Sequence, residues 1–222
     1  MRFTVNGAAL DCDPAHLVVA GWTGRDGAAV QHHIDELAEL GVAPPSQVPL
    51  YYRCAPSLLT QSPRITVLGP DSSGEAEPLV LIAGGKRFLG LGSDHTDRKL
   101  EAVSVAASKQ LCAKPVAPLL WPWDEVAPHL ERIEITSDIH ERGAWVAYQQ
   151  GTLDAIRPLD SLIEGSGLAG LAAEGAAAML CGTFGAKGGV RPAERMRMTM
   201  RDKVLGRVIS LEYETSTLPV VA

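Results

Sequence analysis

The sequence predicts an α+β fold that is mainly β. Its 222 residues include 22 glycines and 15 prolines, which interrupt the chain at short intervals. Most of the apolar runs between them are short and rich in Val, Ile and Leu, as strands are, and few segments show the apolar spacing of a helix. With 46% apolar residues the chain can bury a substantial core. We expect one domain over 1–222, the alternative being a small N-terminal subdomain over 1–60 that carries a lid helix.

The expected strands are short apolar segments that end at or near glycine, proline or polar residues. In chain order they are RFTVNG (2–7), HLVVAGWTG (16–24), RITVLG (64–69), PLVLIA (78–83), RFLGLGS (87–93) and VLGRVISLEYET (204–215). Residues 27–40 predict a helix, because Val30 and Ile34 begin an apolar series at helical spacing and Gly41 is a good C-terminal stop. Residues 100–112 are a second candidate helix, and residues 158–183 are more helical at their start than at their end.

Charge and composition exclude several classes of partner. The formal charge of −6 comes from 26 acidic and 20 basic residues dispersed along the chain, so we expect no nucleic-acid partner. No stretch has the length and apolarity of a signal peptide or a bilayer span, which predicts a cytoplasmic protein without membrane association. The cysteines are far apart and form no CxxC pair, which argues against a zinc site; they are Cys12, Cys54, Cys112 and Cys181.

Three carboxylates flank a predicted hairpin. Strand alternation places Glu75 and Glu77 on one face, and a two-residue turn at 85–86 would set Asp94 opposite Glu77. Opposed like charges need a proton or a cation, and oxygen-only ligands suit Mg²⁺ first, with Mn²⁺ or Ca²⁺ as alternatives. The competing interpretation is that the glutamates lie in a polar loop and Asp94 simply begins a turn.

Several motifs occur in the order found in the fumarylacetoacetate hydrolase superfamily. EAE (75–77) and SDHTDR (93–98) resemble its Glu-x-Glu and Asn-Asp-x-Ser-x-Arg strands. Residues 20–41 resemble its Gly-Arg-Asn segment and the following helix with a His-x-x-Glu pair. APLLWPWDEV (117–126) and LCGTFGAKGGV (180–190) resemble its Pro-Leu-Gly-Pro-Trp segment and Thr-Gly-Thr-Pro-x-Gly-Val loop. Within the superfamily the chain is most similar to a bacterial family, domain of unknown function 2848.

The sequence also departs from the superfamily pattern. Ser93 stands where Asn is usual, Lys99 replaces the Asp after the arginine, and Phe184 replaces a proline. These differences leave the metal ligands in place and concern the substrate pocket.

The resemblance implies a mixed β-roll or β-sandwich with a few peripheral helices, a homodimer, and Mg²⁺ or Mn²⁺ held by Glu75, Glu77 and Asp94, with no organic cofactor. The metal would polarise a carbonyl of a small 2-oxo or 1,3-dicarbonyl acid for C–C hydrolysis or decarboxylation. Isomerisation or hydration is a second possibility within the same superfamily. Two non-enzymatic interpretations are a catalytically silent small-acid-binding protein and a structural dimer with an uncoordinated acidic patch.

The resemblance also suggests the remaining site residues. His33 is the expected water-activating base with Glu36 as its orienting carboxylate, His32 being the alternative, on a helix able to close as a lid. Lys109 is the expected catalytic cation, with Lys114 as its competitor. The expected substrate-binding residues, which could bind an anion or its carbonyl groups, are Arg25, Tyr52, Arg98, Gln110 and Thr183.

Overall fold

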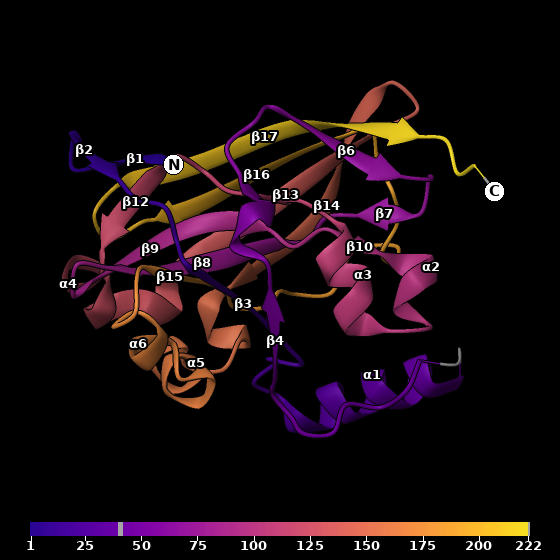
Figure 1. Ribbon diagram of the computed structural model, residues 1–222, viewed down its shortest axis with the longest axis horizontal. Helices are drawn as coiled ribbons and strands as arrows, with labels where there is room; N and C mark the ends of the chain where they lie inside the picture. The colour runs from indigo at the N-terminus through magenta and orange to yellow at the C-terminus, as the bar shows by residue number, and fades with distance from the viewer. Residues whose placement is uncertain (40–41, 222) are drawn as a thin grey trace.

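Two large β-sheets form the centre of the protein, and short helices lie around them (Figure 1). The computed structural model describes residues 1–39 and 42–221, and only the backbone of His33 and Leu37. The first sheet has eight strands, in the spatial order β2 (Ala8–Asp11), β1 (Arg2–Val5), β12 (Leu119–Pro122), β9 (Lys86–Ser93), β8 (Ala76–Ala83), β15 (Ala177–Leu180), β3 (His16–Gly21) and β4 (Leu50–Cys54).

The second sheet has five strands, in the order β14 (Ala144–Thr152), β13 (Glu134–Glu141), β16 (Arg195–Asp202), β17 (Arg207–Leu218) and β6 (Arg64–Leu68). Two small ladders pair β10 (Thr96–Asp97) with β7 (Ser72–Ser73) and β11 (Lys114–Pro115) with β5 (Leu59–Thr60). The described α-helices are α1 (Gly27–Glu39), α2 (Arg98–Glu101), α3 (Val105–Leu111), α4 (Trp123–Val126), α5 (Leu159–Ser166) and α6 (Leu168–Leu171). The 3₁₀ segments are Pro56–Leu58, Ala127–Arg132 and Leu153–Ala155.

The mainly-β fold class is confirmed, and all six predicted strands are present as β1, β3, β6, β8, β9 and β17. β13, β14 and β16 were not predicted, because alternating polar residues interrupt their apolar runs. Each of the described helices is too short or too polar to span a bilayer.

The eight-stranded sheet is buried on both faces. Along β8, Val80 and Ile82 join the core shared with the five-stranded sheet, whereas Leu79 and Leu81 join a second cluster on the opposite face. β3 alternates between the same two clusters. Period-two alternation with both faces covered therefore explains why these strands read as continuous apolar runs.

The β8–β9 hairpin turns one residue earlier than predicted. Gly84 and Gly85 have φ angles of +55° and +71°, the conformation that two-residue hairpin turns require at both central positions. A turn at Gly85-Lys86 would instead have put a lysine in the left-handed region. As a result Asp94 exchanges backbone hydrogen bonds of 3.0 and 3.2 Å with Glu75, not with Glu77. The predicted pairing is wrong by two residues, which leaves all three carboxylates on the predicted common face.

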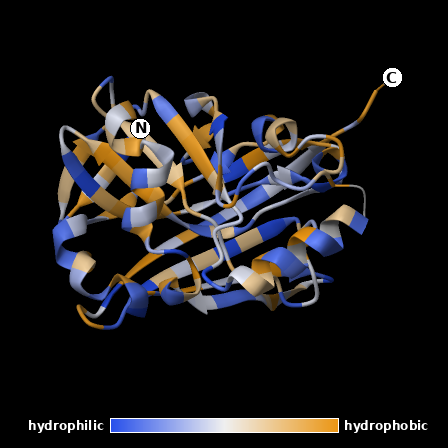
Figure 2. Cartoon of the chain, turned by 90° about the horizontal axis from the view of Figure 1, so that it is seen from below, coloured by the Kyte–Doolittle hydropathy of each residue, from blue (hydrophilic) through white to orange (hydrophobic). Residues whose placement is uncertain are grey.

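The described helices are short, and Figure 2 shows polar and apolar residues side by side in helical segments. The predicted N-terminal helix is confirmed as α1, where Asp26 Oδ1 accepts hydrogen bonds from the first turn and Ile34 is buried. Its predicted end at residues 40–41 lies outside the described residues. The second predicted helix is wrong as a single element, because Ser104 caps α3 through Ala107 N–H and so divides α3 from α2. The 158–183 prediction is confirmed: α5 and α6 precede β15.

Candidate active site

The three predicted ligands lie together where β8 begins and β9 ends. Glu77 lies on the same face of β8 as Leu79, the face turned away from the five-stranded sheet. Glu75 and Asp94 extend the ladder by one pair beyond Ala76 and Ser93. α3 and β11 supply lysines to this patch and β4 supplies an aromatic ring, so its side chains come from distant parts of the sequence.

Asp94 is held by two buried lysines. Lys109 Nζ lies 2.5 Å from Asp94 Oδ2, and Lys114 Nζ lies 3.0 Å from Oδ1. Burial disfavours the carboxylate form of Asp94, but the two ammonium groups outweigh burial and lower its pKa. The expected choice between Lys109 and Lys114 does not arise, because both contact the aspartate.

One oxygen of Asp94 still lacks a good hydrogen bond. Lys114 donates to the carbonyl oxygens of His95 and Lys109, the latter at 2.7 Å, so its contact with Oδ1 is an ion pair without hydrogen-bond geometry. Asp94 Oδ1 is therefore a buried oxygen without a hydrogen-bond partner among the described residues. Such atoms in native proteins are commonly satisfied by a water molecule or an ion.

Glu77 is a buried acid, 3% exposed. Its Oε2 accepts a 2.8 Å hydrogen bond from the backbone N–H of Gly182. Burial raises the pKa of Glu77 well above its usual value, and the negative charge of Asp94 raises it further. The Gly182 backbone has a φ of +89°, and a Cβ there would lie 1.8 Å from Thr23 Oγ1, so only glycine fits at this position.

Glu75 is neutralised by Arg98. Arg98 Nη2 lies 2.9 Å from Glu75 Oε2, and the same guanidinium donates to Glu101 at 3.1 Å and to Ser73 Oγ at 2.6 Å. Arg98 thus pairs with carboxylates of its own chain, and its expected role in substrate binding stays a prediction.

The donor chemistry of this site fits a hard divalent cation, since it consists of carboxylate oxygens and includes Asp94 Oδ1, which lacks a hydrogen bond among the described residues. The side chains do not, however, stand in a three-ligand arrangement: within residues 1–39 and 42–221 no group of three or more Asp, Glu, His or Cys side chains is close enough to hold a metal. Arg98 and Lys109 instead supply the positive charge, and a metal would have to compete with them.

Two of the predicted substrate-binding residues border this site. The ring of Tyr52 lies 5.7 Å from Lys109 Nζ as a cation–π contact. Thr183 Oγ1 donates to Ala76 O at 2.6 Å, next to Glu77, and accepts from Gln149 Nε2 at 2.7 Å. Gln149 is buried and was missed, since nothing in its local sequence marks it.

Two other candidates are engaged elsewhere. Arg25 forms an ion pair of 2.7 Å with Glu131 and donates to Ile156 O at 3.1 Å. Gln110 is exposed, and its Oε1 accepts from Ala55 N–H at 2.9 Å. The structure brings neither to the carboxylates.

The predicted base lies on α1. The side chain of His33 is outside the described part of the chain, and the histidine seen beside Glu36 is His32, with Nε2 3.6 Å from Oε1. Both members of this i,i+4 pair are exposed. Figure 1 shows α1 as a separate helix below α2 and α3, and the His-Glu base remains a prediction.

Next to Asp94 in the chain, His95 belongs to a buried polar network that the sequence did not predict. His95 forms hydrogen bonds through both ring nitrogens, 2.9 Å from Nδ1 to Ser72 Oγ and 2.7 Å from Nε2 to Tyr213 Oη, and Ser93 Oγ lies 2.8 Å from the same Oη. Burial, followed by the charge of Lys114, lowers the pKa of His95 to about 3. Both ring nitrogens of His95 thus contact hydroxyl groups and not the three carboxylates. Tyr213 is far from His95 in sequence, so this pairing could not be foreseen.

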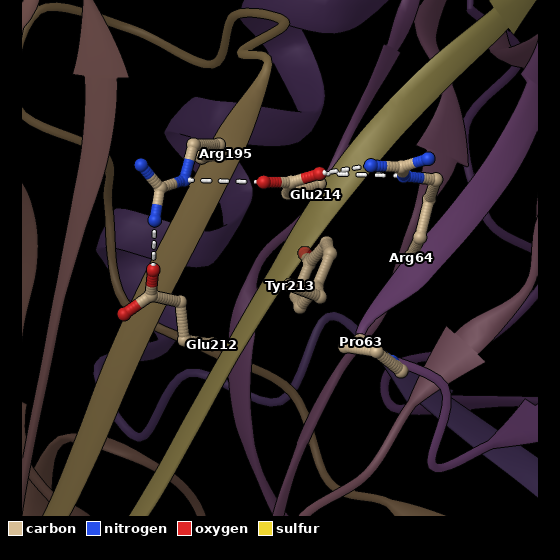
Figure 3. A pocket seen from close by; sticks show the side chains of 6 residues that line it. All are labelled: Pro63, Arg64, Arg195, Glu212, Tyr213 and Glu214. Atoms are coloured by element: carbon tan, nitrogen blue, oxygen red, sulfur yellow. Dashed lines mark hydrogen bonds and ion pairs between the residues drawn. The ribbon is translucent and has the colours of Figure 1, made fainter.

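A separate hollow of about 550 Å³ lies on the five-stranded sheet, over β16, β17 and β6 (Figure 3). Its charges pair with one another: Arg64 lies 2.7 Å from Glu214, and Arg195 lies 2.5 Å from Glu212. None of the three carboxylates at the β8–β9 ends is among the described residues that line it. These paired charges are distinct from the candidate active site.

Solved structures share this fold, and one of them is described as a member of the family that the sequence motifs resemble. A Yersinia pestis CO92 protein described as belonging to the fumarylacetoacetate hydrolase family superposes with a TM-score of 0.66 at 17% identity, over 97% of this chain and 100% of that one. A Burkholderia cenocepacia protein described as a fumarylpyruvate hydrolase gives 0.64 at 16%, over 98% and 92%. A 2-keto-3-deoxy-D-arabinonate dehydratase, complexed with magnesium and 2,5-dioxopentanoate, gives 0.62 at 13%, over 94% and 75%.

The chain belongs to the family described as protein of unknown function (DUF2848), whose model matches residues 20–213. No curated protein matches the chain in sequence. The three solved structures are below 25% identity and share the fold of this chain.

Proposed function

We propose that the protein is a divalent-metal-dependent hydrolase or lyase that acts on a small 2-oxo or 1,3-dicarbonyl acid. The observation that carries this proposal is the gathering of Glu75, Glu77 and Asp94 in one patch, where Asp94 Oδ1 lacks a hydrogen bond among the described residues. A purely structural cluster would gain nothing from a buried, poorly satisfied acid such as Glu77. The magnesium and dicarbonyl compound bound to the dehydratase of the same fold support this choice of ligands.

Glu75, Glu77 and Asp94 would hold the metal, and a bound Mg²⁺ would polarise the substrate carbonyl oxygen. The chain's own residues have separable tasks. Lys109 is charged, since Asp94 and Glu77 raise its pKa despite burial, and it can donate to the substrate carboxylate. Gly182 N–H fixes the orientation of Glu77. The ring of Tyr52 shields the Lys109 ammonium from water.

For the base we propose the His-Glu pair of α1, in which Glu36 orients His33. His32 is the alternative to His33. Closure of α1 would bring this group to a water molecule beside the substrate carbonyl. C–C hydrolysis or decarboxylation is the expected reaction; isomerisation or hydration would use the same carbonyl chemistry. Only product analysis separates these reactions.

Metal removal tests the proposal. After EDTA treatment and dialysis, we expect Mg²⁺ or Mn²⁺ to raise the melting temperature, and oxalate to raise it further only when metal is present, because ligands that bind the native state stabilise it. Glu77→Gln should abolish the metal effect. Glu212→Gln, an exposed ion-pair variant, should retain it.

The outcomes distinguish the competing classes. No melting shift with any divalent ion would overturn the metal assignment. A shift without turnover on a panel of 2-oxo and 1,3-dicarbonyl acids would indicate a binding protein on this scaffold. Turnover that is lost in Lys109→Met and in Glu77→Gln would support the enzyme.

A further inference from the structure

A second candidate site lies on the other face of the eight-stranded sheet. Successive residues of β4 point to opposite faces: Tyr52 packs against the cluster beside Lys109, whereas Tyr51 packs against the core shared with the five-stranded sheet. Beside Tyr51 is a hollow of about 350 Å³ between β4, the segment before it and α5. The residues that line it are Gln47, Val48, Pro49, Tyr51, Arg157, Ser161, Leu162 and Gly165.

Arg157 is the one charged residue among the described residues lining this hollow. Its backbone N–H is fixed by a 2.8 Å hydrogen bond to Thr23 O. Within the described part of the chain its guanidinium has no carboxylate within ion-pair distance, and its Nε is buried without a hydrogen-bond partner. The arginines of the other hollow, Arg64 and Arg195, are by contrast ion-paired (Figure 3).

The surroundings of Arg157 suit an organic anion. Tyr51 lines the same hollow as Arg157, so its hydroxyl is a hydrogen-bond donor available to a ligand that pairs with the cation. Gly165 makes this possible, because a Cβ there would lie 2.4 Å from Tyr51 Oη. Val48 and Leu162 provide an apolar wall. One cation matches one negative charge, which favours a carboxylate over a phosphate dianion.

We propose that this hollow binds a small monocarboxylate, with Arg157 and the Tyr51 hydroxyl holding the carboxylate and the apolar wall covering its hydrocarbon part. The site is separate from the proposed metal centre and needs no metal. Tyr51 and Tyr52 are adjacent in β4. A ligand in the hollow would therefore contact the same strand that carries the ring beside Lys109.

Calorimetric titration of EDTA-treated protein with butanoate at constant ionic strength tests this site. We expect saturable binding that Arg157→Gln weakens at least tenfold and Tyr51→Phe weakens less, because a charged hydrogen bond contributes more than a neutral one. Gly165→Ala should also weaken binding by displacing the hydroxyl. Arg195→Gln, from the ion-paired hollow, should leave the affinity unchanged.

Three further measurements define the result. n-Butanol, which lacks the charge, should not bind; if it binds as well as butanoate, the carboxylate assignment is wrong. Inorganic phosphate binding more tightly than butanoate at Arg157 would overturn the monocarboxylate class. Butanoate binding that persists in Arg157→Gln but disappears in Lys109→Met would place the ligand beside Glu75, Glu77 and Asp94 and overturn the proposal. The absence of butanoate binding to the unmodified chain would also overturn it. Binding lost in Arg157→Gln and retained in Lys109→Met supports it, whatever the outcome of the metal experiment.

Discussion

At the scale of single residues, the candidate active site is a balance of buried charges. Asp94 has two lysines and Glu75 has an arginine, whereas the partner of Glu77 among the described residues is a backbone N–H. Burying unpaired charges costs several kcal/mol each, so such groups persist in pairs or beside a bound ion. The unequal pairing is what distinguishes this cluster from an ordinary structural ion-pair network.

Lys114 gives the clearest stability test at this scale. Its ammonium is fully buried against Asp94 and two carbonyl oxygens. We expect Lys114→Met to lower the free energy of unfolding by about 3–5 kcal/mol, because it leaves part of a buried negative charge uncompensated. Urea denaturation measures this, with exposed Lys86→Met as the control. A loss below about 1 kcal/mol would mean that Lys109 alone neutralises Asp94.

At the scale of elements, turns decide where the site residues meet. The Gly84-Gly85 turn fixes the β8–β9 register and therefore places Glu75 opposite Asp94. A register shifted by one residue would send one side of the patch to the opposite face. The relative positions of the three carboxylates thus depend on a short glycine turn at the far end of the hairpin.

Gly85→Ala tests the turn. We expect it to lower the free energy of unfolding by about 1–2 kcal/mol, since a Cβ is unfavourable at a φ of +71° even where space is open. Gly170→Ala in α6 also meets open space but lacks a positive φ, and should be neutral or slightly stabilising. Equal effects of the two substitutions in thermal denaturation would contradict the backbone explanation.

The β16–β17 turn is held by Asp202, which predicts a pH dependence. Burial opposes ionisation of Asp202, but His129 at 3.0 Å and the N–H groups of Val204 and Leu205 outweigh it and lower the pKa. Because the folded pKa is below the unfolded value of about 3.9, this stabilisation is present above that value and lost as the pH falls through the folded pKa.

We therefore expect Asp202→Asn to lower the free energy of unfolding by about 1–3 kcal/mol at neutral pH. The difference from the unmodified chain should stay constant down to about pH 5 and shrink below about pH 4. Denaturation curves across this range measure it, and Asp124→Asn, on the separate helix α4, is the control. A difference that grows on acidification would show that the aspartate is not stabilised as its anion.

At the scale of the whole molecule, the eight-stranded sheet separates two chemical environments. The carboxylate site lies on one face, and the Arg157 hollow and the His95–Tyr213 network lie on the other, toward the five-stranded sheet. This arrangement needs both faces of the sheet to be buried, which the alternating clusters provide.

The expected homodimer belongs to this scale and remains a prediction. Sedimentation equilibrium should give twice the chain mass of 23.5 kDa, independent of butanoate and of metal. A single species at the chain mass would contradict the dimer but would not contradict either proposed site.

Much was determined by the sequence itself. Short apolar runs between glycines and prolines predicted the mainly-β fold, and the spacing of Glu75 and Glu77 placed them on one face, because strand periodicity is a local property. The predicted hairpin register was wrong by two residues, because the sequence alone did not show which two adjacent turn residues would adopt positive φ. Only the tertiary structure decided that Lys109 and Lys114 both reach Asp94, that Arg25 turns to Glu131, and that Arg157 Nε is buried without a hydrogen bond among the described residues. Those positions depend on residues far apart along the chain, and burial of the whole core selects them.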